Sequence, residues 1–210
     1  RNPIYQENSL VIIVSQSGET ADSLAALRDA KAHGCKVLSI VNVVGSSIAR
    51  ESDAVLYTWA GPEISVATTK AYSCQLAVFY LLALKFAQIR SAITPDTFQT
   101  LLTALKQLPD QMEGLLSQKE KIQFFANHYL ATEHIFFMGR GIDYAISMEG
   151  SLKLKEISYI HSEAYAAGEL KHGTISLMEE GTLVVALATQ DALYPKTVSN
   201  MIEVKTRGAF

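Results

Sequence analysis

Residues 10–28 decide the fold of this chain, because they combine an apolar run, a small polar loop and an amphipathic segment. In order they read Leu10-Val11-Ile12-Ile13-Val14, then Ser15-Gln16-Ser17-Gly18-Glu19-Thr20, then Ala21-Asp22-Ser23-Leu24-Ala25-Ala26-Leu27-Arg28. The first run predicts a buried strand and the last predicts a helix. A helix that starts directly after such a loop has unpaired N–H groups in its first turn. Together with the helix dipole, these groups predict a site for an anion such as phosphate.

The side chains of the loop also favour an anion site. Ser15, Ser17 and Thr20 supply three hydroxyl groups, and Gly18 allows the backbone to approach a ligand closely. The alternative is an ordinary helix N-cap made by a Ser or Thr side chain. Three hydroxyls and a glycine at the carboxyl end of a predicted parallel strand favour the ligand site.

The rest of the chain alternates between strands and helices. Further strands are predicted at 36–43, 54–58, 134–138 and 182–188, and helices at 21–33, 63–90, 96–130, 142–160 and 195–206. The helical segment 96–130 is expected to break near Leu108-Pro109-Asp110. This alternation predicts an α/β fold of doubly wound parallel sheets with helices on both faces. We expect a first subdomain at residues 1–90, a helical connector at 91–130 and a second subdomain at 131–210.

A faint internal repeat supports two related subdomains. Residues 10–16 align with residues 183–189, and each stretch precedes a predicted helix that runs towards a glycine, Gly34 or Gly208.

Composition excludes several classes of function. The chain has 210 residues, of which 49% are hydrophobic and 19% charged, as in compact soluble proteins. Its net charge of −3 gives no reason to expect a nucleic acid or a membrane surface as partner. The longest apolar run, residues 77–84, is too short to span a bilayer and predicts a buried helix. Cys35 and Cys74 lack metal-ligand spacing, so we expect no metal and a reduced, cytoplasmic protein.

A second candidate site lies in residues 149–173. Glu149, Lys153 and Glu156 would share one face of a helix, either as a solvated ladder of ion pairs or as reactive groups. The segment 164–173 is too rich in Gly and Ala to predict a stiff core element. His172 by itself predicts a loop histidine before Gly173.

Residues 15–20 resemble the phosphate loop of sugar isomerase (SIS) domains. The runs 149–161 and 162–173, with segments 45–53 and 62–71, resemble the isomerase domain of glucosamine-6-phosphate synthases, and the likeness covers essentially the whole chain. It implies two SIS-type, flavodoxin-like subdomains, both incomplete. The family's glutaminase domain, the first strand of its first subdomain and its Schiff-base lysine lie outside this sequence, so we expect the chain to be part of a longer protein.

The resemblance also implies an activity and a role for each matched residue. Fructose 6-phosphate and glutamine-derived ammonia would give glucosamine 6-phosphate, a precursor of UDP-N-acetylglucosamine, without a cofactor. Glu156 would move a proton between C1 and C2, Lys153 would be the cation beside it, and His172 would open the sugar ring. The implied substrate contacts are Ser15, Gln16, Ser17 and Thr20 for the phosphate and Val66 and Thr68 for the sugar. Arg140 is a further candidate for an anion or interface contact.

Two other functions stay open at this point. A non-catalytic sugar-phosphate sensor would need the phosphate loop but no carboxylate for proton transfer, so the pairing of Glu156 with His172 argues against it. A phosphosugar isomerase or deglycase of the SIS fold would turn over without ammonia. The partners implied are a small sugar phosphate, a second copy of the chain in a homodimer, and a glutaminase domain.

Overall fold

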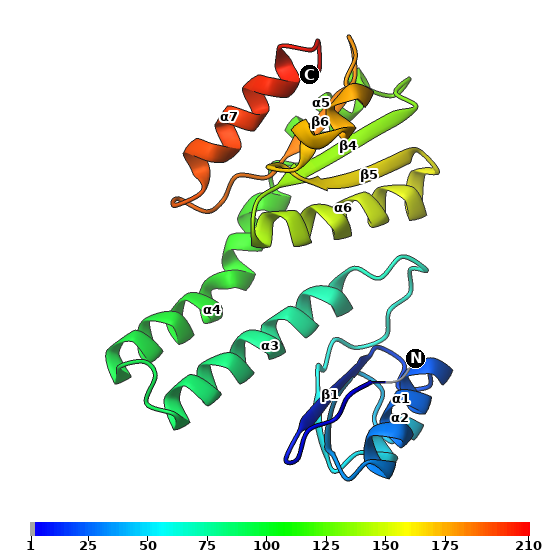
Figure 1. Cartoon of the computed structure of the whole chain (residues 1–210), viewed down its shortest axis with the longest axis vertical. Coiled ribbons are helices and arrows are strands. Elements are labelled where there is room, and N and C mark those ends of the chain that lie inside the picture. Colours follow the sequence, from blue (N-terminus) through cyan, green and yellow to red (C-terminus); the bar gives the residue numbers. More distant parts are fainter. Residues whose placement is uncertain (1–2) are drawn as a thin grey trace. The chain divides into compact units, whose positions relative to one another are not determined.

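The computed structural model describes residues 3–210 (Figure 1); Arg1 and Asn2 lie outside the described residues. The chain divides after Ser117 into two compact units, here called unit 1 and unit 2. Each unit holds a three-stranded sheet in which every strand pair is parallel. The predicted α/β fold of parallel sheets flanked by helices is therefore confirmed. The boundary falls inside the helical segment 91–130, so that its two helices belong to different units.

Unit 1 contains the strand, loop and helix of residues 10–28. Its sheet has the order β1-β2-β3, formed by β1 (Leu10–Ser15), β2 (Lys36–Val41) and β3 (Ala54–Tyr57). Helices α1 (Ala21–Ala32) and α2 (Ser47–Glu51) pack on the sheet through an apolar core that includes Leu27, Val37 and Ile48. Because β1 and β2 run in parallel with Ser15 opposite Val41, the loops that follow both strands emerge at the same edge.

Unit 2 has helices on both faces of its sheet. The strands are β4 (His134–Gly139), β5 (His161–Ala166) and β6 (Leu183–Ala186), in the order β5-β4-β6. Its helices are α5 (Lys119–His128), α6 (Ile142–Ser158) and α7 (Tyr194–Lys205), with short 3-10 turns η1 (Leu170–His172) and η2 (Thr174–Leu177). Figure 1 shows α6 on one side of the sheet and α7 on the other. Successive side chains of β4 lie on opposite faces of the sheet. Phe136 packs in the same core as Val204 of α7, whereas Phe137 lies against Gly150 of α6.

The strand β5 corrects the interpretation of residues 164–173. Their small side chains argued against a stiff element, yet residues 161–166 pair with β4 along its whole length. Ser162 is fully buried, and its hydroxyl donates to the Ser151 hydroxyl of α6 at 2.9 Å. Residues 164–166 therefore belong to the sheet, and the small side chains of Ser162 and Ser151 let α6 approach it closely.

Two helix boundaries in unit 1 also differ from the prediction. Helix α3 (Lys70–Ile89) begins seven residues after Glu63, whose carboxylate accepts hydrogen bonds from the N–H groups of Thr69 and Ala71 at 3.3 Å. Helix α4 (Pro95–Leu116) continues through Pro109 and ends before Ser117. Proline removes one N–H donor and strains the preceding turn, but regular turns on both sides keep the helix continuous.

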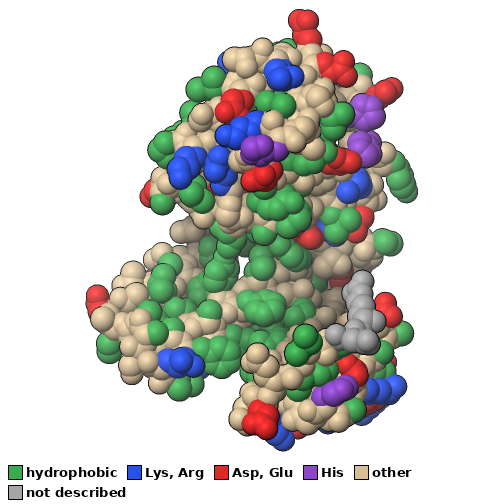
Figure 2. Space-filling view, viewed as in Figure 1, with side chains coloured by type: hydrophobic (Ala, Val, Ile, Leu, Met, Phe, Trp, Pro, Cys, Tyr) green, Lys and Arg blue, Asp and Glu red, His purple; other side chains and the backbone are tan. Residues whose placement is uncertain are grey.

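Helix α3 is apolar but mostly exposed, so the prediction of a buried helix is wrong. Ala71 and Leu84 are its buried residues, and Figure 2 shows hydrophobic side chains gathered over α3 and α4. By length and composition alone, α3 is the one helix in residues 3–210 that could cross a membrane. Core helices of soluble proteins pass the same test.

The internal repeat is visible in the structure. Leu10 precedes the first residue of α1, Ala21, by the same number of residues as Leu183 precedes the first residue of α7, Tyr194. Both helices have 12 residues. Each helix leads back to the sheet, where the Lys36 N–H donates to the Ser9 carbonyl at 3.3 Å and the Phe210 N–H to the Thr182 carbonyl at 2.9 Å.

Candidate functional site

The loop 15–20 is folded around the hydroxyl of Ser15. The Ser15 Oγ accepts a hydrogen bond from the N–H of Gly18 at 3.0 Å and lies 3.1 Å from the hydroxyl of Thr20. The Ser17 Oγ accepts from the N–H of Glu19 at 3.2 Å. Ser15 is buried, whereas Ser17 and Thr20 are exposed. The structure thus gathers the three predicted hydroxyl residues in one loop, with two of them open to solvent.

The start of α1 lacks the ordinary cap that was the alternative explanation of these residues. Thr20 occupies the N-cap position, but its side chain makes no capping hydrogen bond. It contacts Ser15 instead. The first N–H groups of a helix have no partner within the helix, so those of α1 stay available beside the Ser17 and Thr20 hydroxyls. A helix N-terminus arranged in this way attracts an anion.

A neighbouring segment of unit 1 holds the loop in place. Gly18 has a φ of +68°, and a Cβ atom there would lie 2.0 Å from the Ser46 Oγ. The Gly18 carbonyl accepts from the N–H of Ile48 at 3.0 Å. The Glu19 carboxylate accepts from the N–H of Ser47 at 2.8 Å, and this bond holds the pKa of Glu19 below its ordinary value. The negative charge of Glu19 is therefore engaged by the first turn of α2.

Gln16 and Ser46 leave polar atoms unpaired next to the loop. The backbone carbonyl of Gln16 accepts from the N–H of Asn42 at 3.2 Å. Its side-chain Oε1 and the Oγ of Ser46 are buried, without a hydrogen-bond partner in the part of the chain that the structure describes. A buried polar atom without a partner costs about 1–3 kcal/mol. Ser46 was absent from the predicted site; its sequence signal is the Gly45-Ser46-Ser47 turn.

Val66 and Thr68 lie in the irregular segment between β3 and α3. Val66 is fully exposed and Thr68 is half-buried. Their role as sugar contacts stays a prediction.

In unit 2, Glu149, Lys153 and Glu156 share one face of α6, as their spacing predicts. The Lys153 Nζ lies 2.5 Å from a Glu156 carboxylate oxygen and 3.6 Å from a Glu149 carboxylate oxygen. The hydrogen bond to Glu156 is the main cause that raises the pKa of Lys153 above its ordinary value. The side chain of Glu156 is 36% exposed. The ion pairs of a ladder are thus present, and unit 2 by itself does not enclose the Glu156 carboxylate.

His172 ends the 3-10 turn η1, directly before Gly173, which has a φ of +148°. Its N–H donates to the Glu169 carbonyl at 3.0 Å, and its ring is exposed without a partner in the described residues. No described hydrogen bond joins it to Glu156. An accessible imidazole of this kind can exchange protons with a ligand.

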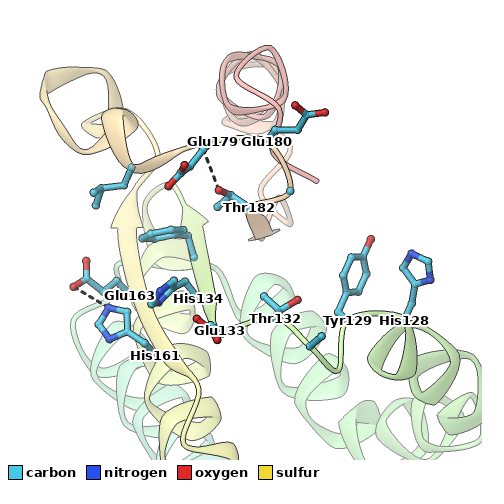
Figure 3. Close-up of a pocket in the computed structure, with 14 residues that line it drawn as sticks. His128, Tyr129, Thr132, Glu133, His134, His161, Glu163, Glu179, Glu180 and Thr182 are labelled. Atoms are coloured by element: carbon cyan, nitrogen blue, oxygen red, sulfur yellow. Dashed lines mark hydrogen bonds and ion pairs between the residues drawn. The ribbon is translucent and has the colours of Figure 1, made fainter.

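A cavity of about 650 Å³ lies in unit 2 at the amino ends of the strands. Figure 3 shows residues that line it, among them His134 and His161, whose rings lie 5.5 Å apart, and Glu163, which contacts His161. None of the predicted site residues lines it. Residues 3–210 contain no group of three His, Cys, Asp or Glu side chains that could hold a metal ion.

Known proteins resemble the chain over its full length. The family model described as SIS domain matches residues 2–85 and 129–209. The chain is 59% identical over 210 residues to a glutamine–fructose-6-phosphate aminotransferase (isomerizing) of Caldanaerobacter subterraneus subsp. tengcongensis, and 52% identical to one of Methanosarcina acetivorans. It covers 34% of each, so it spans about a third of the length of these curated relatives.

Two solved structures give the same comparison in three dimensions. The C-terminal domain of a glucosamine-fructose-6-phosphate aminotransferase from Francisella tularensis matches with a TM-score of 0.97 and 41% identity. That match covers 100% of this chain and 59% of the other. A tagatose-6-phosphate ketose/aldose isomerase from Escherichia coli has a TM-score of 0.75 at 20% identity, over 95% of this chain and 54% of the other, which is a likeness of fold alone.

Proposed function

We propose, since the chain belongs to the SIS domain family, that it is the sugar-phosphate-binding isomerase part of a glutamine–fructose-6-phosphate aminotransferase. The observation that carries this proposal in the structure is the uncapped start of α1 beside the hydroxyls of Ser17 and Thr20. The identity to aminotransferases over the whole chain supports the substrate, fructose 6-phosphate. The product would be glucosamine 6-phosphate, which serves the synthesis of UDP-N-acetylglucosamine.

The phosphate group is proposed to bind at the loop 15–20. The hydroxyls of Ser17 and Thr20 and the first N–H groups of α1 donate to its oxygens, and Ser15 and Gln16, the latter through its backbone, are the further proposed contacts. Ser46 adds a buried hydroxyl without a partner in the described chain. Val66 and Thr68 are proposed to contact the sugar, as the match to the family's sugar-contacting positions implies.

Proton transfer is proposed for the second set of residues. His172 takes the proton of the ring hydroxyl and returns one to the ring oxygen, which opens the closed sugar. Ammonia adds at C2 and water leaves. Glu156 then removes a proton from C1, and a proton is returned to C2, so that the amino sugar carries its aldehyde at C1. Lys153, held 2.5 Å from Glu156, keeps positive charge beside the carboxylate.

One assay separates this function from its two rivals. The full-length protein, incubated with fructose 6-phosphate, should form glucosamine 6-phosphate only when ammonia or glutamine is present. Glucose 6-phosphate formed at the same rate without ammonia would identify a phosphosugar isomerase instead. Binding without any turnover would identify a sensor.

A homodimer is proposed for the assembled enzyme, with His172 donated to the site of the partner subunit. The exposed His172 ring, without a hydrogen bond to Glu156, is compatible with this arrangement. Mixing full-length Glu156→Gln and His172→Ala proteins should then restore some activity. No recovery despite demonstrated subunit exchange would place both residues in one subunit.

The remaining partners follow from the relatives. The ammonia is proposed to come from a glutaminase domain outside this chain. A cytoplasmic location is proposed because Cys35 and Cys74 are both free thiols.

A further inference from the structure

Asp143 is a buried carboxylate that the proposed function does not use. It lies in the first turn of α6 and is only 3% exposed. Its Oδ2 accepts from the N–H of Thr189 at 2.9 Å, and its Oδ1 from the Thr189 hydroxyl at 2.5 Å. Burial raises the pKa of Asp143, but hydrogen bonds from Thr189 and then from Gln190 outweigh burial and hold that pKa below its ordinary value. Asp143 therefore stays negatively charged inside unit 2.

The partners of Asp143 lie in the loop that repeats the phosphate loop. Residues 187–193 connect β6 to α7, just as residues 16–20 connect β1 to α1. The two strand–helix pairs have equal spacing, and on that spacing Thr189 corresponds to Gln16 and Gln190 to Ser17. Leu193, at the N-cap of α7, makes no side-chain cap. Asp143 thus accepts from the N–H and the hydroxyl of Thr189, the counterpart of Gln16, at the start of the loop whose counterpart in unit 1 is proposed to bind an anion.

Other residues close this second loop around the carboxylate. The Gln190 Nε2 donates to the carbonyl of Arg140 at 2.7 Å. The Arg140 Nε donates in turn to Asn200 of α7 at 3.0 Å. Gln190 also lies against Gly141, where a Cβ atom would be 3.1 Å from the Gln190 Oε1. The Gln190 and Arg140 side chains are therefore engaged by hydrogen bonds within unit 2.

We infer that Asp143 is a built-in anion that occupies the second phosphate loop, so that unit 2 binds no phosphate while Asp143 is present. Removal of this side chain should open a site for a small oxyanion, such as inorganic phosphate or acetate. Two copies of one strand–loop–helix therefore need not give two sugar-phosphate sites, whichever reaction the protein catalyses.

The test is anion rescue of the Asp143→Ala variant. The variant should melt about 5 °C or more below the parent, and inorganic phosphate or acetate should raise its melting temperature more than chloride of equal ionic strength. Asp143→Asn should also melt lower but should not be rescued, because its amide still fills the site. Asp191→Ala is the matched control, since it removes an exposed carboxylate of the same loop and should change little. Equal effects of phosphate, acetate and chloride on Asp143→Ala would overturn the inference.

A second measurement tests the inference if Asp143→Ala does not fold. Inorganic phosphate is titrated into the chain carrying Ser17→Ala and Thr20→Ala, with Asp143 intact, and the amide signals of Thr189 and Gln190 are followed by NMR. Unchanged signals are expected. Saturable shifts of these two amides would show that the loop is open in the presence of Asp143. Failure of phosphate to bind the loop 15–20 of the parent would instead count against the proposed function alone.

Discussion

The hydroxyl oxygens of Ser15 and Thr20 lie 3.1 Å apart, at opposite ends of the loop that joins β1 to α1. The Ser15 oxygen also accepts the N–H of Gly18 at 3.0 Å, so one buried hydroxyl ties the middle and the end of the loop to its start. Thr20 is exposed and contacts Ser15 in place of capping α1, which leaves its hydroxyl accessible to a ligand.

The first prediction concerns the two exposed hydroxyls of this loop. The double variant Ser17→Ala and Thr20→Ala should weaken the binding of fructose 6-phosphate by about 1.5–3 kcal/mol, the range for hydrogen bonds to a charged group. Isothermal titration calorimetry measures the change. Thr100→Ala, which removes an exposed hydroxyl from α4, serves as control. An affinity equal to that of the parent would place the phosphate elsewhere.

The second prediction concerns Gly18. Gly18→Ala should lower both stability and phosphate affinity, because its φ of +68° disfavours a side chain and the new Cβ would meet Ser46. Gly34→Ala is the matched control, with a φ of +78° and no atom within 4 Å of the added Cβ. Chemical denaturation should show a larger loss for Gly18→Ala, and Ser46→Gly should restore part of it. Equal losses at both glycines would show that backbone strain is the whole effect and that the contact with Ser46 contributes nothing.

The third prediction uses the pKa of Glu19. Its hydrogen bond from the Ser47 N–H lowers this pKa in the folded protein, so ionised Glu19 adds stability above the ordinary value of 4.5. That stability is lost as the pH falls through the folded pKa. Glu19→Gln should therefore be less stable than the parent at pH 7, and the difference should shrink in acid. Urea unfolding from pH 3 to 7 measures it, with Glu7→Gln as control. A difference that stays constant with pH would show that the charge of Glu19 plays no part.

The elements with strong local signals could be predicted from the sequence. The β-branched run 10–14 and the spaced leucines of 21–28 gave the strand and helix as observed. Strand β5 could not be predicted, because Ser162, Ala164 and Ala166 carry no strand preference of their own. Their pairing with β4 and the close approach of α6 decide the structure. The continuity of α4 through Pro109 likewise depends on the turns around it.

In the candidate site, too, residues that are close in sequence could be predicted together, and residues that are far apart could not. Ser15, Ser17 and Thr20 are neighbours in sequence, so local reasoning brought them together. Ser46 reaches the loop only because Gly18 has no side chain, a relation that no local pattern contains. Asp143 and Thr189 are separated by 46 residues, and their contact follows from the order of the strands in the sheet.

We propose that Glu156 is the base that moves a proton between C1 and C2 of a bound sugar phosphate. Incorporation of solvent deuterium into fructose 6-phosphate by the full-length protein tests it most directly. Glu156→Gln should slow the exchange by about 10²–10⁴-fold, as expected for loss of a general base, while Glu149→Gln, on the same face of α6, should slow it far less. Exchange at a near-parental rate in Glu156→Gln, with binding intact, would contradict the claim and leave Glu156 as a member of a surface ion-pair ladder.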